Sequence, residues 1–232
     1  MLSVIPNPPR ITLPIHGSDD LFPVRRVYCV GRNYRAHARE MGADERDPPF
    51  FFLKPADTLQ VVPEGGTADH PYPPRTENYH FEVELVAALG VGGRDIPVAT
   101  AAAHVYGYAI GLDMTRRDLQ DEAKRQARPW ELGKAADFSA PIGPLRPAGT
   151  IGHPRSGAIT LAVDGDERQR GDLSEMIWSV PEQVALLSTY FELHPGDLIF
   201  TGTPSGVGPV KPGDRIVVTI DGLETLSFEI KP

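Results

Sequence analysis

The chain has 232 residues, a single cysteine and no long uninterrupted run of apolar residues. Cys29 cannot form an internal disulfide, and its place in the apolar run 27–30 indicates a small buried side chain rather than an exposed nucleophile. No stretch approaches the roughly 18 apolar residues of a membrane span. Prolines interrupt the first 25 residues, so no signal peptide is indicated. We therefore expect a cytoplasmic protein without a membrane partner.

Positive charge is also scarce. Lysine and arginine number 23 against 31 aspartate and glutamate residues, which gives a formal net charge of -8. Such a chain repels phosphate backbones, so a nucleic-acid partner is not expected. The hydrophobic share of 41% is ordinary for a globular protein with a core. The length suits one domain, alone or with a small N-terminal appendage.

Proline and glycine are abundant, with 24 and 23 residues spread along the chain. This density interrupts long helices and favours short strands joined by turns. We expect helices over 33–41, 116–126 and 181–193, and strands over 10–15, 27–30, 50–53, 80–88, 105–112, 158–163, 197–201, 215–220 and 226–230. The pattern predicts a mainly β fold with some α, a sandwich or roll rather than a doubly wound βαβ sheet.

Three carboxylates suggest a metal site. Glu82 and Glu84 are two residues apart on an expected strand, so they face the same side and repel each other unless a cation lies between them. Mg²⁺ and Mn²⁺ prefer such oxygen ligands. Asp113 ends an apolar strand and could complete the site. The alternatives are a solvated strand face for the glutamates and a helix N-cap for Asp113. His80 shares the face, and we expect it to support the site rather than to bind the ion.

Three further motifs are weak signals when taken singly. His37 and Glu40 would share a helix face, where the carboxylate could orient the imidazole as a base for water, or they could be a surface pair. Lys134 could offset an oxyanion, or lie at the surface. The glycine-rich loop 201–208 could bind an anion through its N–H groups, or be a plain turn.

In their order along the chain, these motifs are specific. The sequence resembles the fumarylacetoacetate hydrolase family over roughly residues 25–232, and most closely its short acylpyruvase and fumarylpyruvate hydrolase members. The matching segments are Cys29–Tyr34 with His37 and Glu40, Leu53–Pro55, Glu82 with Glu84, Gly107–Tyr108, Leu112–Thr115, Arg117–Asp118 with Gln120, Gly133–Lys134, Pro195–Asp197, Thr201–Pro204 and Gly206–Gly208. The resemblance implies a catalytic domain over 25–232 behind a short appendage, residues 1–24.

The resemblance also implies a fold, a site and partners. The fold would be the family's mixed β-sandwich roll, usually a homodimer. The metal ligands for Mg²⁺ or Mn²⁺ would be Glu82, Glu84 and Asp113, and the catalytic residues His37, Glu40 and Lys134. Lys54, Arg117, Gln120 and Thr203 would contact the substrate or support the site. From its charge alone, we expect Arg32 to contact the acyl end of the substrate.

The implied reaction is hydrolysis of a carbon–carbon bond in a small 2,4-dioxo acid, an acylpyruvate such as fumarylpyruvate, maleylpyruvate or acetylpyruvate. Water activated by His37 and Glu40 would attack, and the metal and Lys134 would stabilise the departing pyruvate enolate. Two alternatives are open: decarboxylation of oxaloacetate at the same site, which needs no activated water, and a metal-stabilised binding module without turnover.

Overall fold

The computed structural model describes residues 4–6, 8–36 and 48–232. Within them the largest element is an eight-stranded mixed sheet. Its hydrogen-bonded order is β4 (Phe50–Lys54), β3 (Val27–Gly31), β15 (Leu198–Phe200), β8 (Val83–Leu89), β9 (Val105–Leu112), β11 (Ala140–Ile142) and β5 (Leu59–Val61), and β12 (Arg146–Pro147) also pairs with β9. The chain therefore forms a mainly β structure, as expected.

Both faces of the eight-stranded sheet are covered, which explains why β8 and β9 are almost continuously apolar. Along β8, Leu85 and Ala87 belong to one hydrophobic cluster, and Val86 and Ala88 belong to another. The alternation follows from the period of two in a strand. The two clusters therefore lie on opposite faces of the sheet.

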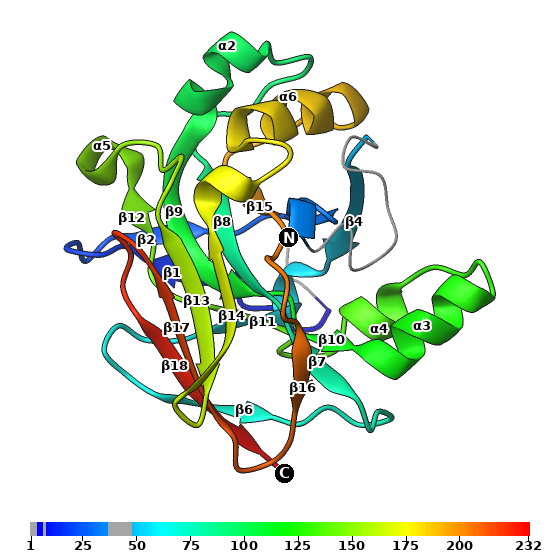
Figure 1. Ribbon diagram of the computed structural model, residues 1–232. Helices are drawn as coiled ribbons and strands as arrows, with labels where there is room; N and C mark the ends of the chain where they lie inside the picture. Colours follow the sequence, from blue (N-terminus) through cyan, green and yellow to red (C-terminus); the bar gives the residue numbers. More distant parts are fainter. Residues whose placement is uncertain (1–3, 7, 37–47) are drawn as a thin grey trace.

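A second sheet packs over the first of these clusters. Its order is β14 (Asp166–Asp172), β13 (Ala158–Val163), β17 (Arg215–Ile220), β18 (Leu226–Lys231) and β6 (Ala68–Pro71). α6 (Val180–Tyr190) covers the same cluster with Val184 and Leu187. Figure 1 shows the two sheets curled around each other, with α2 (Val98–Ala101) and α6 at one end. This is the expected β-sandwich roll.

The second cluster is closed by the N-terminal hairpin of β1 (Thr12–Pro14) and β2 (Leu21–Pro23). Leu13 and Phe22 of this hairpin pack in the same cluster as Cys29 of β3, whose side chain is fully buried. Burial raises the pKa of the Cys29 thiol well above its usual range. The first 24 residues thus contribute side chains to the core of the sheet.

The segment expected as one strand over 80–88 is two strands. β7 (Tyr79–Phe81) pairs with β10 (Thr115–Arg116) and β16 (Gly208–Val210), whereas β8 belongs to the eight-stranded sheet. The chain passes from one sheet to the other at Glu82. The expected strand over 80–88 was therefore wrong at this residue, because alternation within a sequence does not show a change of sheet.

The remaining elements are short and surround this frame. Two helices, α3 (Arg117–Arg125) and α4 (Glu131–Lys134), stand together at one side of the molecule (Figure 1). The others are α5 (Ala148–Ile151) and the 3-10 turns η1 (Ala56–Thr58), η2 (Ala102–His104) and η3 (Leu173–Glu175). Among the described residues, no helix is long and apolar enough to cross a membrane. Residues 37–41 of the expected helix over 33–41 lie outside the described residues.

Candidate metal centre and active site

Glu82, Glu84 and Asp113 meet where β8 and β9 lie side by side. The ladder between these strands continues one step past β9, because the N–H of Asp113 donates to the carbonyl of Glu82 at 2.9 Å. All three side chains are buried, and one ligand atom from each lies within 4.8 Å of the others. The structure thus brings the three expected metal ligands together. α3 begins only at Arg117, so the N-cap alternative for Asp113 was wrong.

Two lysines neutralise the inner side of this cluster. Lys134 Nζ donates to Glu82 Oε2 at 2.8 Å, to Asp113 Oδ2 at 2.6 Å and to Thr115 Oγ1 at 2.8 Å. Lys54 Nζ lies 3.0 Å from Asp113 Oδ1. Burial lowers the pKa of Lys134, but the charges of Asp113 and Glu82 more than offset this and raise it above its usual value. Lys134 is therefore a fixed positive charge.

Glu84 is in a different position. Its Oε2 accepts the N–H of Gly202 at 2.8 Å, but it pairs with none of the lysines or arginines in the described residues. Burial raises its pKa well above the usual range, and the charges of Asp113 and Glu82 raise it further. Lys54, Lys134 and Arg117 contact Asp113 or Glu82, and no lysine or arginine of the described residues contacts Glu84. Three convergent carboxylates, one of them without a direct cationic contact among these residues, fit a hard divalent cation.

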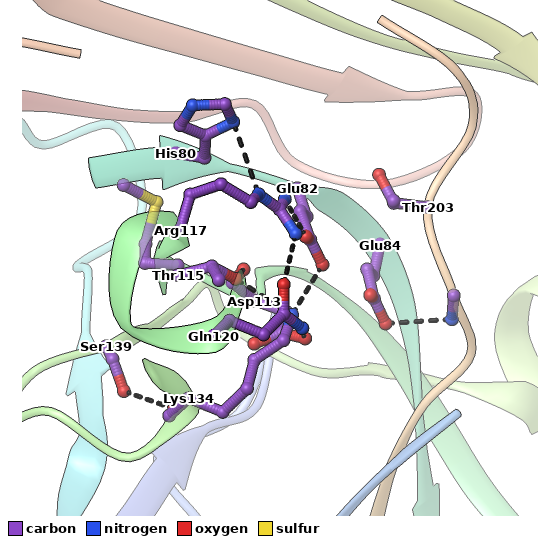
Figure 2. Close-up of polar contacts among 12 residues, drawn as sticks. His80, Glu82, Glu84, Asp113, Thr115, Arg117, Gln120, Lys134, Ser139 and Thr203 are labelled. Atoms are coloured by element: carbon purple, nitrogen blue, oxygen red, sulfur yellow. Dashed lines mark hydrogen bonds and ion pairs between the residues drawn. The ribbon is translucent and has the colours of Figure 1, made fainter. Parts of the chain in front are cut away.

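Arg117 and Gln120 of α3 form the next layer of the site (Figure 2). Arg117 Nη2 pairs with Glu82 Oε1, and Nη1 donates to Gln120 Oε1 at 2.5 Å. Gln120 Nε2 makes no hydrogen bond with the described residues and can donate to a bound oxygen. α3 comes close to α4 only because Gly133 has no side chain: a Cβ there would lie 2.9 Å from the backbone nitrogen of Gln120.

His80 is held neutral behind Arg117. Its Nε2 lies 2.7 Å from Asn78 Oδ1 and its Nδ1 is 3.5 Å from Arg117 Nε, which can only donate. The proton of the ring therefore belongs on Nε2. Burial and the charge of Arg117 lower the pKa of His80 to about 4. The position agrees with the expected supporting role rather than with that of a ligand.

A cavity opens beside the carboxylates. It is lined by Val30, Gly31, Arg32, Phe50, Phe52, Glu82, Glu84, Asp113, Arg117, Gln120, Lys124, Trp130, Lys134 and Thr203. Four of the five residues expected to contact the substrate or support the site line it. The fifth, Lys54, lies beneath Asp113, where its ammonium donates to the carbonyls of Met114 and Ser139 at 3.2 and 3.1 Å. The structure therefore places Lys54 as a support of the acidic cluster.

The outer part of the cavity holds two cations stacked on aromatic rings. Arg32 lies over Phe50 at 5.7 Å, and Lys124 lies over Trp130 at 5.4 Å, while the two rings meet edge to face. The backbone of Arg32 has a positive φ of 58°. Lys124 was not anticipated, since a lysine on an otherwise polar helix carries no signal of a cavity.

Asn33 is another residue whose role was not anticipated. It is fully buried, and its Nδ2 donates to the carbonyls of Thr201 and Trp178 at 2.7 and 2.9 Å. It thereby fixes the loop that presents Gly202 to Glu84. Gly202 has φ of +98°, and a Cβ there would lie 2.6 Å from Asn33 Cβ, so glycine is required. An asparagine after a predicted strand is a weak signal of such a contact.

His37 and Glu40, the expected water-activating pair, lie outside the described residues. Their role stays a prediction from the sequence.

The curled sheets and the buried acidic cluster define a β-roll protein with a carboxylate site of the kind that binds divalent metals. The chain belongs to the fumarylacetoacetate (FAA) hydrolase family, because the model of that family's C-terminal domain matches residues 26–231.

Among solved structures, a fumarylpyruvate hydrolase from Pseudomonas aeruginosa in complex with Mn²⁺ and pyruvate is 60% identical, with a TM-score of 0.98 and coverage of 99% of both chains. Among curated relatives, the mitochondrial oxaloacetate tautomerase FAHD1 of Mus musculus is 42% identical over 89% of this chain and 92% of its own. The mitochondrial oxaloacetate decarboxylase of Dictyostelium discoideum is also 42% identical, over 89% of this chain and 94% of its own.

Proposed function

We propose that this protein is a divalent-metal-dependent hydrolase that cleaves a carbon–carbon bond in a 2,4-dioxo acid of the acylpyruvate type. The products are pyruvate and a carboxylic acid. The proposal is carried by the convergence of three buried carboxylates, one of them without a cationic partner in the described part of the chain, in a cavity that also holds Lys134. It is supported by the 60% identity to a fumarylpyruvate hydrolase that binds Mn²⁺ and pyruvate.

Glu82, Glu84 and Asp113 would hold Mn²⁺ or Mg²⁺. When bound, such an ion supplies a Lewis acid that polarises a substrate carbonyl and balances the charge of the departing enolate. The residues fit the ion because their carboxylates converge and Glu84 contacts no cation of the described residues.

Lys134 acts in this proposal through its charge. Its three N–H groups are engaged by Glu82, Asp113 and Thr115. It therefore keeps those two carboxylates ionised and oriented, and contributes a positive potential to the cavity. Gln120 Nε2 makes no hydrogen bond with the described residues, and Arg117 fixes its orientation through Gln120 Oε1.

His37, oriented by Glu40, would take the proton from the attacking water, as the resemblance implies. This step distinguishes hydrolysis from decarboxylation, which needs no water. We expect His37→Ala to abolish acylpyruvate hydrolysis and to spare any decarboxylation of oxaloacetate.

Arg32 and Lys124 would contact the acyl end of the substrate. Arg32 pairs with no carboxylate in the described residues, and Lys124 has Asp121 only at 3.5 Å. Two cations at the outer part of the cavity favour an acyl group with its own carboxylate, such as the fumaryl group. Arg32→Met should then reduce kcat/KM for fumarylpyruvate by about 10-fold or more, the value of a charge-assisted contact, and leave acetylpyruvate nearly unaffected.

The first experiment is steady-state release of pyruvate from fumarylpyruvate, maleylpyruvate and acetylpyruvate with Mn²⁺, with Mg²⁺ and with EDTA. Pyruvate release that requires metal supports the proposal, and the ranking of substrates tests the acyl-end contacts. Glu84→Gln serves as the inactive control. No release from any of the three substrates at saturating metal would refute the hydrolase.

Oxaloacetate is the second candidate substrate. The curated relatives named as oxaloacetate tautomerases and as an oxaloacetate decarboxylase favour it, at 41–42% identity. Oxaloacetate is also a 2-oxo acid with a second carboxylate, so the same cations suit it. Evolution of CO₂ from oxaloacetate without acylpyruvate cleavage would assign the decarboxylase, and enol–keto conversion without CO₂ would assign the tautomerase.

We also propose that the protein works as a homodimer in the cytoplasm, in the breakdown of aromatic compounds that yields acylpyruvates. Light scattering during size-exclusion chromatography tests the dimer, since a monomeric mass of the active protein would refute it. Cell fractionation tests the cytoplasmic location. Growth on aromatic substrates after deletion of the gene tests the role in their breakdown.

A further inference from the structure

Gln169 is buried, whereas the other residues of its strand β14 are exposed or partly exposed. β14 reads Asp-Glu-Arg-Gln-Arg-Gly-Asp, and Gln169 is the one fully buried residue in it. The pairing with β13 shows why: Leu161 pairs with Gln169 but Ala162 pairs with Glu167, so Arg168 is an extra residue. Such a bulge redirects the side chains beside it, and here it accompanies a Gln169 side chain that lies between the two sheets.

The hydrogen bonds of Gln169 have a defined direction. The backbone N–H of Val83, which can only donate, lies 3.1 Å from Gln169 Oε1. The other end of the amide, Nε2, therefore donates, and it reaches Thr203 Oγ1 and the carbonyl of Pro204, each at 2.9 Å. Both N–H groups and the oxygen are used, so the amide cannot turn over without losing these bonds.

Because Gln169 Nε2 donates to Thr203 Oγ1, the Thr203 hydroxyl can direct its own proton elsewhere. Its Oγ1 accepts from Gln169, so its own proton is not directed there. Within the described part of the chain, the Thr203 hydroxyl makes no other hydrogen bond, and its side chain lines the cavity. In Figure 2, Thr203 and Glu84 lie on the same side of the carboxylate cluster, opposite Lys134 and Gln120. The remaining direction for its proton is toward an oxygen bound in the cavity.

The backbone around these residues is packed too closely to adjust. A Cβ on Gly171 would lie 2.7 Å from Pro204 Cβ, and one on Gly206 would lie 2.4 Å from the carbonyl oxygen of Arg168. The loop 201–208 therefore rests directly on β14. Gln169 sits at the centre of this contact and also holds Val83, the residue between Glu82 and Glu84.

We infer that Gln169 is a positioning residue, which commits the Thr203 hydroxyl to donate its hydrogen bond to a substrate oxygen and ties this donor to the strand of the acidic cluster. The inference rests on the proposed function, since it assumes that a 2-oxo acid occupies the cavity. Gln169 itself lies outside the cavity and acts through Thr203.

The test is a double-mutant cycle with Gln169→Met and Thr203→Val, which keep volume but remove the bonds. Both single variants should lower kcat for the best acylpyruvate by about 10-fold, the scale of one lost hydrogen bond. The double variant should be no worse than Thr203→Val alone, because Gln169 works through that hydroxyl. Thr203→Ser, which retains the hydroxyl, should keep most of the activity. Equal, independent losses that multiply in the double variant would overturn the inference.

Two further measurements separate positioning from a general structural effect. The affinity of each variant for Mn²⁺ alone should change by less than about 3-fold, whereas the affinity of the Mn²⁺-loaded protein for pyruvate should fall in Gln169→Met and Thr203→Val alike. Gln60→Met is the matched control: Gln60 bridges Asp69 and His70 away from the cavity, so it should alter stability but not kcat. A loss of Mn²⁺ affinity in Gln169→Met equal to the loss of kcat would refute the positioning role.

The proposed function is tested separately from the role of Gln169. Wild-type protein that releases pyruvate only with metal supports the hydrolase, whatever the cycle shows. Wild-type protein that neither cleaves an acylpyruvate nor binds pyruvate would refute both the hydrolase and the donor role of Thr203.

Discussion

Two buried polar clusters in this chain differ in how their groups are paired. In the first, His70 lies between Gln60 and Tyr79. Gln60 Nε2 donates to the carbonyl of Asp69, so its Oε1 faces His70 Nδ1 at 2.6 Å, and His70 Nε2 lies 3.0 Å from the hydroxyl of Tyr79. Every group has a partner and none is charged. Burial lowers the pKa of His70 to about 4, which keeps the ring neutral at physiological pH.

The second cluster is the acidic centre, where the buried cations are unevenly distributed over the carboxylates. Lys54, Lys134 and Arg117 pair with Asp113 and Glu82, whereas among the described residues Glu84 has only the N–H of Gly202. The difference shows how a structural and a functional polar cluster can be told apart. The first is closed by its own hydrogen bonds, and the second requires a ligand to become complete.

The largest expected effect is on stability, and it comes from removing a charge beneath the acidic centre. Lys54→Met leaves Asp113 without one of its two cations, and breaking a buried ion pair costs about 3–5 kcal/mol. Urea unfolding at neutral pH measures the loss. Lys231→Met is the control, because Lys231 pairs with Glu229 at the surface and such pairs contribute about 0–1 kcal/mol. Similar losses for both variants would contradict the distinction between buried and surface pairs.

Removing the Glu84 carboxylate should separate activity from stability. Glu84→Gln should reduce kcat at saturating Mn²⁺ by at least about 100-fold. Loss of a residue that only hydrogen-bonds to a metal ligand costs about 10- to 100-fold, and loss of a ligand itself should cost more. The same change relieves repulsion in the metal-free protein. We therefore expect the metal-free variant to melt at a higher temperature than metal-free wild type, and the order to reverse when Mn²⁺ is added. A variant less stable than wild type without metal would contradict the repulsion assigned to Glu84.

The neutral cluster around His70 should make the stability of the folded protein depend on pH. The unfolded chain binds a proton at His70 near pH 6.5, whereas the folded protein does so only near pH 4, so stability falls as pH decreases through this interval. At about 1.4 kcal/mol per pH unit, the loss is roughly 3 kcal/mol. His70→Gln should remove this part of the pH dependence and leave the part due to His80, whose pKa is also lowered to about 4. Denaturant unfolding between pH 7.5 and 4 checks it, and parallel curves for both proteins would exclude the explanation.

The smallest expected effect tests the contact between the two helices of the site. Gly133→Ala places a methyl group 2.9 Å from the backbone of Gln120, which should cost about 1–3 kcal/mol as overpacking. Since α4 carries Lys134, kcat should also fall. Gly149→Ala is the control, because nothing lies within 4 Å of the added atom. Unchanged stability in Gly133→Ala would show that the helices separate freely.

The acidic centre could be predicted from the sequence because each of its residues lies in a short, recognisable pattern. Glu82 and Glu84 follow an alternation of two, and Asp113 follows a clear apolar run. The long strands and α6 were predicted for the same reason, since each has the apolar pattern of its type. The resemblance to the family then supplied the order of the motifs and the class of fold.

Other features depend on contacts between distant segments and could not be predicted. Strands of three residues, such as β5 and β11, are too short to show a period. Lys54 was expected to contact the substrate or to support the site, and which of the two it does depends on how β4 packs beneath Asp113. Gln169 lies in a polar run whose bulge turns one side chain inward, and nothing in that run distinguishes it from its neighbours.

The burial of Cys29 has a practical consequence. As the only thiol of the chain, buried on β3 against the hairpin of β1 and β2, it can react with a thiol reagent only when this hairpin or the sheet around β3 opens. The rate of labelling of the native protein therefore reports how often this part of the core opens, without any engineered probe. The same shielding leaves the surface free of reactive thiols, so a cysteine introduced elsewhere can carry a fluorophore or spin label at one defined position.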